Sequence, residues 1–204
     1  MPKDAPLILA FDTSAAHCAA ALLRGDEILQ SALEPMAKGQ AERLLVLCQE
    51  LMEKAGVSVT DLDAIGVGIG PGNFTGIRIS VSAARGMALG LGVPAVGVSS
   101  FDTLRFGTIG PCACAVDARR EMVYLQGFNN PDLAIPQQYA ATDLPPFEGP
   151  LIGATGQAAG HPIAEAIARI TASRYTTETA RPAPLYLRPA DAAPARDAAP
   201  VILP

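Results

Sequence analysis

The sequence predicts an α/β protein of two lobes, each built on a mixed sheet with helices packed against it. Three observations support this fold class. Strand-like apolar segments alternate with segments of helical periodicity through the first half of the chain. Half of the 204 residues are hydrophobic, which suffices for a substantial core without disulfides or metals. Beyond residue 106 the pattern changes and a second set of apolar residues begins, so two lobes are the simplest division.

The first lobe is expected to open with an antiparallel meander. Three strand-like segments are separated by TSAA and RGD, which are rich in turn residues. A helix follows, because apolar residues from Leu44 to Ala55 recur at helical spacing and Gly56 stands where a helix would stop. The predicted elements are strands at 7–12, 17–23 and 27–33 and a helix at 40–55.

The rest of the first lobe is predicted to alternate buried strands with helices. DAIGVGIG and VPAVGVSS are typical of buried strands at 63–70 and 93–100, with a helix from about Thr75 to Leu91 between them. Small residues in this helix lower its helix propensity, and close approach of another backbone is the compensation we expect. Ser100 is placed to cap a short helix in SFDTLRF.

The second lobe is assigned to residues 107–204 and the first to residues 1–106. CACAVDARREMVYLQGF predicts two strands around a tight turn, and GPLIGATG predicts a further strand. HPIAEAIARITAS predicts a helix with Pro162 near its first turn. From about residue 189 the chain is biased toward Ala and Pro, which favours an extended or poorly ordered tail.

The charge balance argues against direct binding to nucleic acid. The chain has 15 Lys and Arg against 20 Asp and Glu, and its few lysines form no basic stripe. No apolar run reaches the roughly 18 residues of a membrane span, and the apolar stretch near the N-terminus is too short for a signal peptide. We therefore expect a cytoplasmic protein with no membrane contact.

Cysteines and histidines give no signature of a metal site. The only close cysteine pair is C-x-C at Cys112 and Cys114, so all four cysteines are predicted to be buried free thiols. His17 and His161 lie far apart, without the H-x-x-x-H or H-E-x-x-H spacing of a metal site on one helix face. A cluster assembled in space from distant parts of the chain is not excluded.

The stretch GIGPGNFTGIRIS at residues 68–80 has the strand–glycine–helix arrangement of a phosphate-binding loop. It lacks the lysine of a P-loop, the third glycine of the dinucleotide fingerprint and the serine of the nucleophile elbow. Two interpretations remain: a helix N-terminus that attracts an anion, with Thr75 as its cap, or a tight turn without a ligand.

FDTS at the end of the first strand raises a related question. A strand-end aspartate followed by small hydroxyl residues suits coordination of a metal–phosphate pair, although Asp12 is equally a turn residue. With the glycine-rich loop it gives the degenerate outline of an ATPase lobe. A residual nucleotide or anion site would use Asp12, Thr13, Gly72, Asn73 and Thr75.

Four stretches resemble the TsaB (YeaZ) family, which is also classed under glycoprotease-like and peptidase M22-like names. They are ILAFDTS, the segment at 40–104, AVDARREMVY and PLYLR, so the resemblance covers residues 7–129 and again 184–188. The motif G-P-G-[small]-F-T-G-[apolar]-R-I is specific to this group, and here Asn73 stands where serine is usual.

The resemblance implies an actin/Hsp70/sugar-kinase (ASKHA) fold and a noncatalytic role. Proteins of this family pair with and activate TsaD, a larger relative that transfers the threonylcarbamoyl group to the adenosine beside the anticodon of tRNA. TsaD holds its metal with an H-x-x-x-H pair on a helix. The helix after Gly39 begins QAERLLVL and has no histidine, so the resemblance implies neither catalytic nor metal-binding residues in this chain.

The resemblance also implies partners and an interface. It implies a heterodimer with TsaD, a larger complex with the ATPase TsaE, a homodimer when alone and only indirect contact with tRNA. The chain would require no cofactor of its own, and ATP and Mg²⁺ would enter with the assembled complex. The partner surface would lie on the two N-terminal helices, where Val46 falls outside the apolar stripe, and would comprise Glu42, Leu45, Val46, Gln49, Arg78, Ser82 and Arg85.

The residues also leave an enzymatic function open as an alternative. The chain could be an M22-type (glyco)peptidase or a protein that weakly binds or hydrolyses ATP. A peptidase needs a nucleophile–base pair or a metal-bound water, and neither histidine lies in a recognisable catalytic context.

Overall fold

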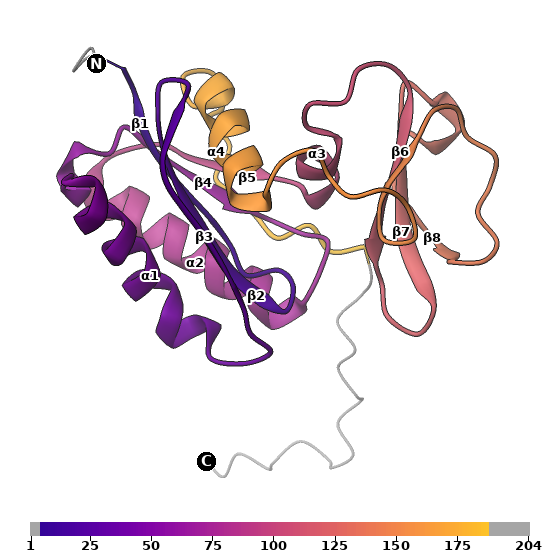
Figure 1. Cartoon of the computed structure of the whole chain (residues 1–204), viewed down its shortest axis with the longest axis horizontal. Helices are drawn as coiled ribbons and strands as arrows, with labels where there is room; N and C mark the ends of the chain where they lie inside the picture. The colour runs from indigo at the N-terminus through magenta and orange to yellow at the C-terminus, as the bar shows by residue number, and fades with distance from the viewer. Residues whose placement is uncertain (1–4, 188–204) are drawn as a thin grey trace, which may run out of the picture.

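The computed structural model describes residues 5–187, so the predicted tail from about residue 189 lies outside the described residues. Two sheets form two lobes (Figure 1). The first has the strand order β3-β2-β1-β4-β5 and the second β8-β7-β6-β9. The first sheet comprises β1 (Leu7–Asp12), β2 (His17–Arg24), β3 (Glu27–Pro35), β4 (Ala64–Gly68) and β5 (Ala95–Val98). The second comprises β6 (Cys112–Asp117), β7 (Met122–Phe128), β8 (Gln137–Ala140) and β9 (Leu151–Gly153).

The helices are α1 (Gln40–Ala55), α2 (Phe74–Leu91), α3 (Ser100–Arg105) and α4 (Ile163–Arg174), with short 3₁₀ turns at Val59–Asp61 and Pro131–Leu133. The predicted meander is confirmed, because β1 pairs antiparallel with β2, and β2 antiparallel with β3. β1 also pairs parallel with β4, and β4 with β5, so the sheet is mixed as predicted.

The side chains of β1 alternate between two cores. Leu7, Leu9 and Phe11 point into the core under α1 and α2, while Ile8 and Ala10 point into the core under α4. Every residue of β1 is buried, which explains why it reads as a continuous apolar run rather than an alternating one. The first sheet is therefore covered on both faces, by α1 and α2 on one side and α4 on the other (Figure 1).

α4 departs from the lobe boundary assigned from the sequence. It falls within 107–204, yet it packs against β1, β2 and β4 of the first sheet. Its buried residues Ile167 and Ala168 complete the core with Val96 and Val98, which would otherwise face solvent. Residues 163–174 thus belong in space to the first lobe, because that lobe has an apolar sheet face that this helix covers.

The caps of α2 and α3 correct two sequence predictions. α2 is capped by Asn73 rather than Thr75, because the Asn73 Oδ1 accepts hydrogen bonds from the backbone N–H groups of Thr75 and Gly76. α3 is capped by Ser99 rather than Ser100, since the Ser99 Oγ accepts from the Asp102 N–H. The Ser100 hydroxyl instead donates to the carbonyl of Pro71.

An Arg43-centred ion-pair network joins α1 to the edge strand β3. Arg43 Nη2 lies 2.6 Å from Glu34 Oε1, and Nη1 lies 2.7 Å from Glu50 Oε1. These hydrogen bonds hold the pKa of both carboxyl groups below their ordinary values. Because the folded-state pKa is lowered, the stabilisation is present above the unfolded pKa of about 4.3 and is lost as the pH falls through the folded values.

We expect Arg43→Gln to make the stability of the protein depend less on pH in the acidic range. The wild-type urea midpoint should fall more steeply than that of the variant between about pH 5 and pH 3, where glutamate protonates. Arg181→Gln, at an exposed position in the segment after α4, serves as the control. Parallel profiles for wild type and Arg43→Gln would show that the network contributes nothing.

All four cysteines are buried free thiols, as predicted. Burial raises the pKa of Cys18 to about 11 and that of Cys48 to about 12, and it also raises the pKa of Cys114. A thiol reagent that attacks the thiolate should therefore leave the native protein unlabelled and react with all four groups in denaturant. Rapid reaction of any thiol with Ellman's reagent in the native state would contradict this burial.

Candidate functional site

The two loops that were predicted to form a residual nucleotide or anion site lie directly against each other. The Thr13 Oγ1 donates to the Gly76 carbonyl at 2.6 Å, and the Asn73 N–H donates to the Ser14 carbonyl at 2.6 Å. A Cβ at Gly72 would overlap the Ser14 carbonyl, and one at Gly76 would overlap the Thr13 carbonyl. Glycine is thus required by contact between two backbones.

The N-terminus of α2 already has an acceptor. The Asn73 Oδ1 lies 3.0 Å from the Thr75 nitrogen and 3.1 Å from the Gly76 nitrogen, and so uses two of the donors that an anion would need. An anion at this helix end would have to displace the asparagine side chain. The local geometry favours the tight turn over the anion site.

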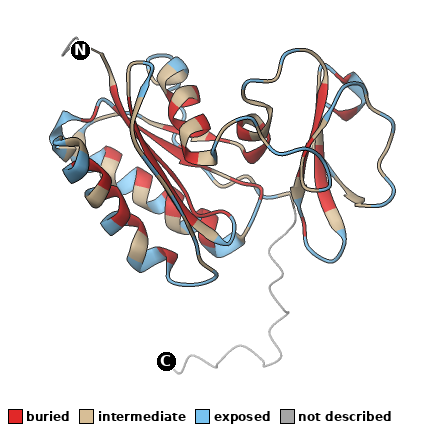
Figure 2. Ribbon diagram, viewed as in Figure 1, coloured by how far each residue is buried: buried red, intermediate tan, exposed pale blue. Residues whose placement is uncertain are grey.

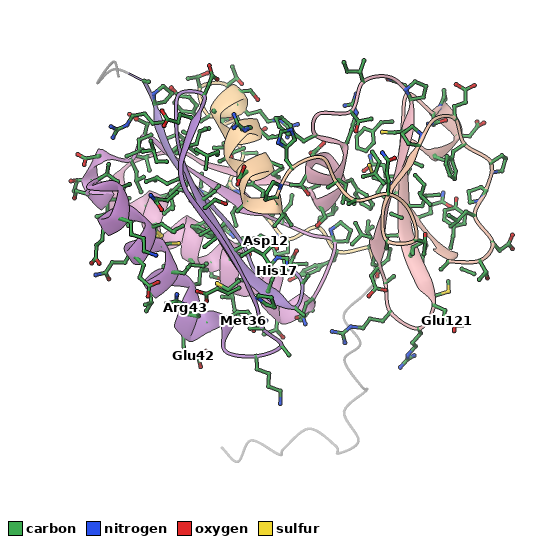
Figure 3. The ribbon with its side chains drawn as sticks, in the orientation of Figure 1. Asp12, His17, Met36, Glu42, Arg43 and Glu121 are labelled. Carbon is green, nitrogen blue, oxygen red and sulfur yellow. The ribbon has the colours of Figure 1, made fainter. Side chains whose placement is uncertain are left out.

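Asp12 is completely buried, and its side chain forms hydrogen bonds within its own turn. Its Oδ1 accepts the N–H and hydroxyl of Ser14, each at 2.9 Å, and lies 2.7 Å from the Nε2 of His17 (Figure 3). Its Oδ2 is buried with no hydrogen-bond partner and lies against Gly68, where a Cβ would overlap it. No sequence pattern predicts the contact with His17, because the two residues lie five positions apart across a turn.

This arrangement does not form an acyl-transfer triad. Ser14 and His17 both bond to Asp12, and within residues 5–187 Ser14 has no hydrogen bond to an imidazole that could take its proton. His161 instead lies edge-on to the Phe106 ring, with centroids 5.0 Å apart. The geometry therefore offers no support for a serine peptidase at this turn.

We expect His17→Ala to destabilise the protein by about 2 kcal/mol, because it removes the ionisable partner of a buried carboxyl group. Urea denaturation near pH 6 measures the loss. His161→Ala is the matched control, since the interaction of His161 within residues 5–187 is its aromatic contact with Phe106, and it should cost less than about 1 kcal/mol. Equal losses for the two variants would contradict a special role for the Asp12–His17 pair.

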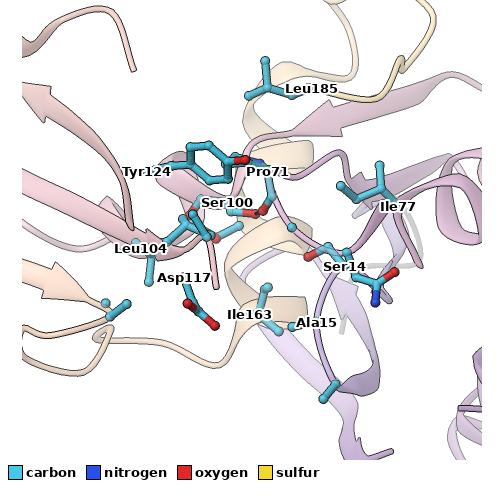
Figure 4. A pocket seen from close by; sticks show the side chains of 18 of the residues that line it. Ser14, Ala15, Pro71, Ile77, Ser100, Leu104, Asp117, Tyr124, Ile163 and Leu185 are labelled. Carbon is cyan, nitrogen blue, oxygen red and sulfur yellow. Dashed lines mark hydrogen bonds between the residues drawn. The ribbon is translucent and has the colours of Figure 1, made fainter. Parts of the chain in front are cut away.

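A cleft of about 1230 Å³ lies between the lobes (Figure 4). Ser14, Ile77 and Ser100 line it from the first lobe, and Asp117 and Tyr124 from the second. Of the predicted anion-site residues, Gly72, Asn73 and Thr75 line the cleft, whereas Asp12 and Thr13 are buried beneath it. No sequence pattern predicts the cleft, although residues of the DARRE turn and Leu185 and Tyr186 of the PLYLR stretch line it.

The outward faces of α1 and α2 carry the predicted partner-interface residues. All seven are exposed: Glu42, Leu45, Val46, Gln49, Arg78, Ser82 and Arg85. The two helices pack against each other on the same side of the sheet, so these faces form one surface, termed here the helix face (Figure 2). Leu45 is 52% exposed and Val46 is 48% exposed, which is unusual for branched apolar side chains.

The structure adds three residues of α2 to the helix face. Leu89 is 83% exposed, and the positions of Gly86 and Gly90 open onto free space. Leu89 could have been found from the sequence, because it continues the spacing of Arg78, Ser82 and Arg85 along one side of a helix. The small residues of α2 therefore include a buried set and an exposed set to which Gly86 and Gly90 belong.

Neither a membrane span nor a metal cluster is present in the described part of the chain. No helix within residues 5–187 is long and apolar enough to cross a bilayer. Within the same range, no three His, Cys, Asp or Glu side chains are grouped closely enough to hold a metal ion.

Comparison with known proteins gives a consistent family. Residues 34–140 match the model of the TsaD family, described as tRNA N6-adenosine threonylcarbamoyltransferase. An uncharacterised protein of Mycobacterium tuberculosis is 32% identical over 201 residues, covering 92% of this chain and 94% of that protein. The tRNA threonylcarbamoyladenosine biosynthesis protein TsaB of Escherichia coli is 36% identical over 122 residues, covering 57% of this chain and 52% of that protein.

A solved structure supports the fold. YeaZ from Pseudomonas aeruginosa aligns with a TM-score of 0.55 at 36% identity, over 60% of each chain. The chain thus aligns with about half the length of the E. coli relative and with 60% of the YeaZ structure. Together with the mixed five-stranded sheet, this likeness shows the actin/Hsp70/sugar-kinase-like fold that the sequence predicted.

Proposed function

This chain belongs to the TsaB (YeaZ) family, and from that premise we propose that it is a noncatalytic partner and activator of a TsaD-type threonylcarbamoyltransferase. Its role would lie in the biosynthesis of threonylcarbamoyladenosine in tRNA, the process for which its TsaB relatives are named. The partner would be TsaD, with TsaE in a larger complex, and the site of action would be the cytoplasm.

The helix face carries this proposal. Leu45, Val46 and Leu89 expose apolar side chains on a surface of two packed helices. Gly86 and Gly90 would let another helix approach closely, since nothing lies within 4 Å of where their Cβ atoms would be. An apolar surface rimmed by charged residues such as Glu42 and Arg85 is typical of a protein–protein interface. The same face would support a homodimer when the partner is absent.

Two features support the noncatalytic part of the proposal. The loops of the residual nucleotide site are joined by direct hydrogen bonds from Thr13 and Asn73, which leaves their donors engaged. The first turns of α1 carry no histidine at all. ATP and Mg²⁺ would then be supplied by the other subunits of the assembled complex, with no cofactor held by this chain alone.

The test is reconstitution with TsaD and TsaE encoded in the same genome. The chain should co-elute with TsaD in gel filtration, and omitting it should abolish formation of threonylcarbamoyladenosine on tRNA. The proposal is wrong if the chain does not co-elute with TsaD and is not required for the modification. Cleavage of a peptide substrate by the purified chain, unchanged in the His17→Ala/His161→Ala double variant, would favour an enzyme that works without histidine.

A further inference from the structure

We propose that Arg78, held in place by Phe74 and Tyr186, is a preformed binding site for a carboxylate side chain of the partner protein. The inference rests on the proposed function, because it assumes a partner that docks on the helix face. It assigns that partner an aspartate or glutamate at one particular place in the interface.

Arg78 is fixed by two aromatic side chains. Its guanidinium carbon lies 3.7 Å from the centroid of the Phe74 ring, and its Nε donates a 2.8 Å hydrogen bond to the Tyr186 hydroxyl. The two rings support each other, with centroids 5.0 Å apart. A stacked guanidinium with a bonded Nε has lost most of its rotational freedom before any ligand arrives.

The rest of the guanidinium is free to bind. Within residues 5–187, the Arg78 Nη1 and Nη2 atoms make no hydrogen bond or ion pair, and the side chain is exposed. A planar guanidinium with two adjacent free nitrogens matches a carboxylate, which accepts one hydrogen bond on each oxygen. Arg43 shows this pairing within the same chain, since its Nη1 and Nη2 donate to the two carboxylate oxygens of Glu50.

The position of the site connects the cleft with the helix face. Phe74, Arg78 and Tyr186 all line the cleft. Arg78 is also the first residue of the exposed row that continues through Ser82, Arg85 and Leu89. Because Arg78 is exposed, a partner seated on that row can reach the free edge of its guanidinium.

Tyr186 belongs to the PLYLR stretch, and its contact with Arg78 gives this stretch a role in binding the partner, which the proposed function does not include. It stands 108 positions from Arg78 in sequence. The chain reaches it through a segment anchored by the Leu185 N–H, which donates to the Ile69 carbonyl at 2.8 Å. The third element of the site is thus carried by a segment that binds the first lobe at the start of the glycine-rich loop.

The experiment measures the affinity of the full chain for TsaD by calorimetry. Arg78→Lys keeps the charge but loses the planar fork, and we expect about tenfold weaker binding, which corresponds to about 1.4 kcal/mol. Tyr186→Phe keeps the ring but removes the acceptor of the Nε hydrogen bond, and we expect about threefold weaker binding. Arg181→Lys, an exposed arginine outside the helix face, is the matched control and should bind like wild type.

The outcomes separate the two proposals. Absence of wild-type binding to TsaD overturns the proposed function, and this inference with it. Wild-type binding with Arg78→Lys unaffected overturns this inference alone. Melting temperatures of the variants within a few degrees of wild type exclude a folding defect, and if Tyr186→Phe fails this control the Arg78→Lys result decides.

A second arm tests the source of the oxyanion. The isolated chain is titrated with inorganic phosphate, and no binding that depends on Arg78 is expected at millimolar concentration. Phosphate binding that is lost in Arg78→Lys, and that competes with TsaD, would assign the site to a free phosphate and overturn the carboxylate.

Discussion

Leu89→Glu should strongly weaken the proposed pairing with TsaD while leaving the chain folded. Leu89 is 83% exposed, so the substitution removes almost no packing from the free protein. In the complex, it would bury an unpaired carboxylate within an apolar surface, which we expect to cost about 2–4 kcal/mol, or roughly 30- to 1000-fold in affinity. Calorimetry with TsaD and the yield of threonylcarbamoyladenosine in the reconstituted assay both measure the effect.

Ile109→Glu is the control for this variant. Ile109 is 98% exposed but lies in the loop between α3 and β6, outside the helix face. It should bind TsaD within about twofold of wild type and support full modification. Affinity of Leu89→Glu within threefold of wild type would show that the partner uses another surface, and it would remove the main support for the proposed function.

Gly76→Ala and Gly86→Ala should change stability in opposite directions, although they make the same substitution in one helix. At Gly76 a methyl group would overlap the backbone carbonyl of Thr13, and neither backbone can move without breaking the Thr13–Gly76 hydrogen bond. We expect a loss of at least about 3 kcal/mol, at the upper end of overpacking effects. At Gly86 the methyl group would meet nothing, and alanine should stabilise the helix by about 0.5–1 kcal/mol.

Urea denaturation of both variants measures this contrast directly. If Gly76→Ala accumulates only as insoluble protein, the comparison moves to Gly72→Ala, whose methyl group would overlap the Ser14 carbonyl at the same contact. Wild-type stability in both Gly76→Ala and Gly72→Ala would mean that the two loops stand apart in solution. In that event the space between them would again be open to a nucleotide.

The sequence predicted elements well where the signal is local. The meander was predicted to within two residues at each strand end, because turn residues separate the apolar runs. α1 was predicted with its observed bounds, since Gly56 adopts the left-handed conformation that ends a helix. Asn73 and Thr75 are both capping residue types, however, and only the approach of the Ser14 carbonyl decides that Asn73 is the cap.

The candidate sites were predictable only in part, because they depend on contacts between distant segments. The family resemblance implied a partner surface on the two helices, and the helical period explains why its exposed residues share one side. The Arg78–Tyr186 contact joins residues 108 positions apart, and the cleft exists only once two lobes have packed. Sequence patterns also showed that residues 163–174 form a helix but not which sheet that helix covers.

The placement of α4 has a consequence for the order of synthesis. On the ribosome, residues 1–106 emerge first and contain all five strands of the first sheet. The apolar side chains of Ile8, Ala10, Val96 and Val98 nevertheless stay uncovered until Ile167 and Ala168 have been translated. By then the strands β6 to β9 have already been synthesised. The lobe that is begun first is thus the last to close, and a nascent chain stalled between the two events would expose a surface that chaperones bind.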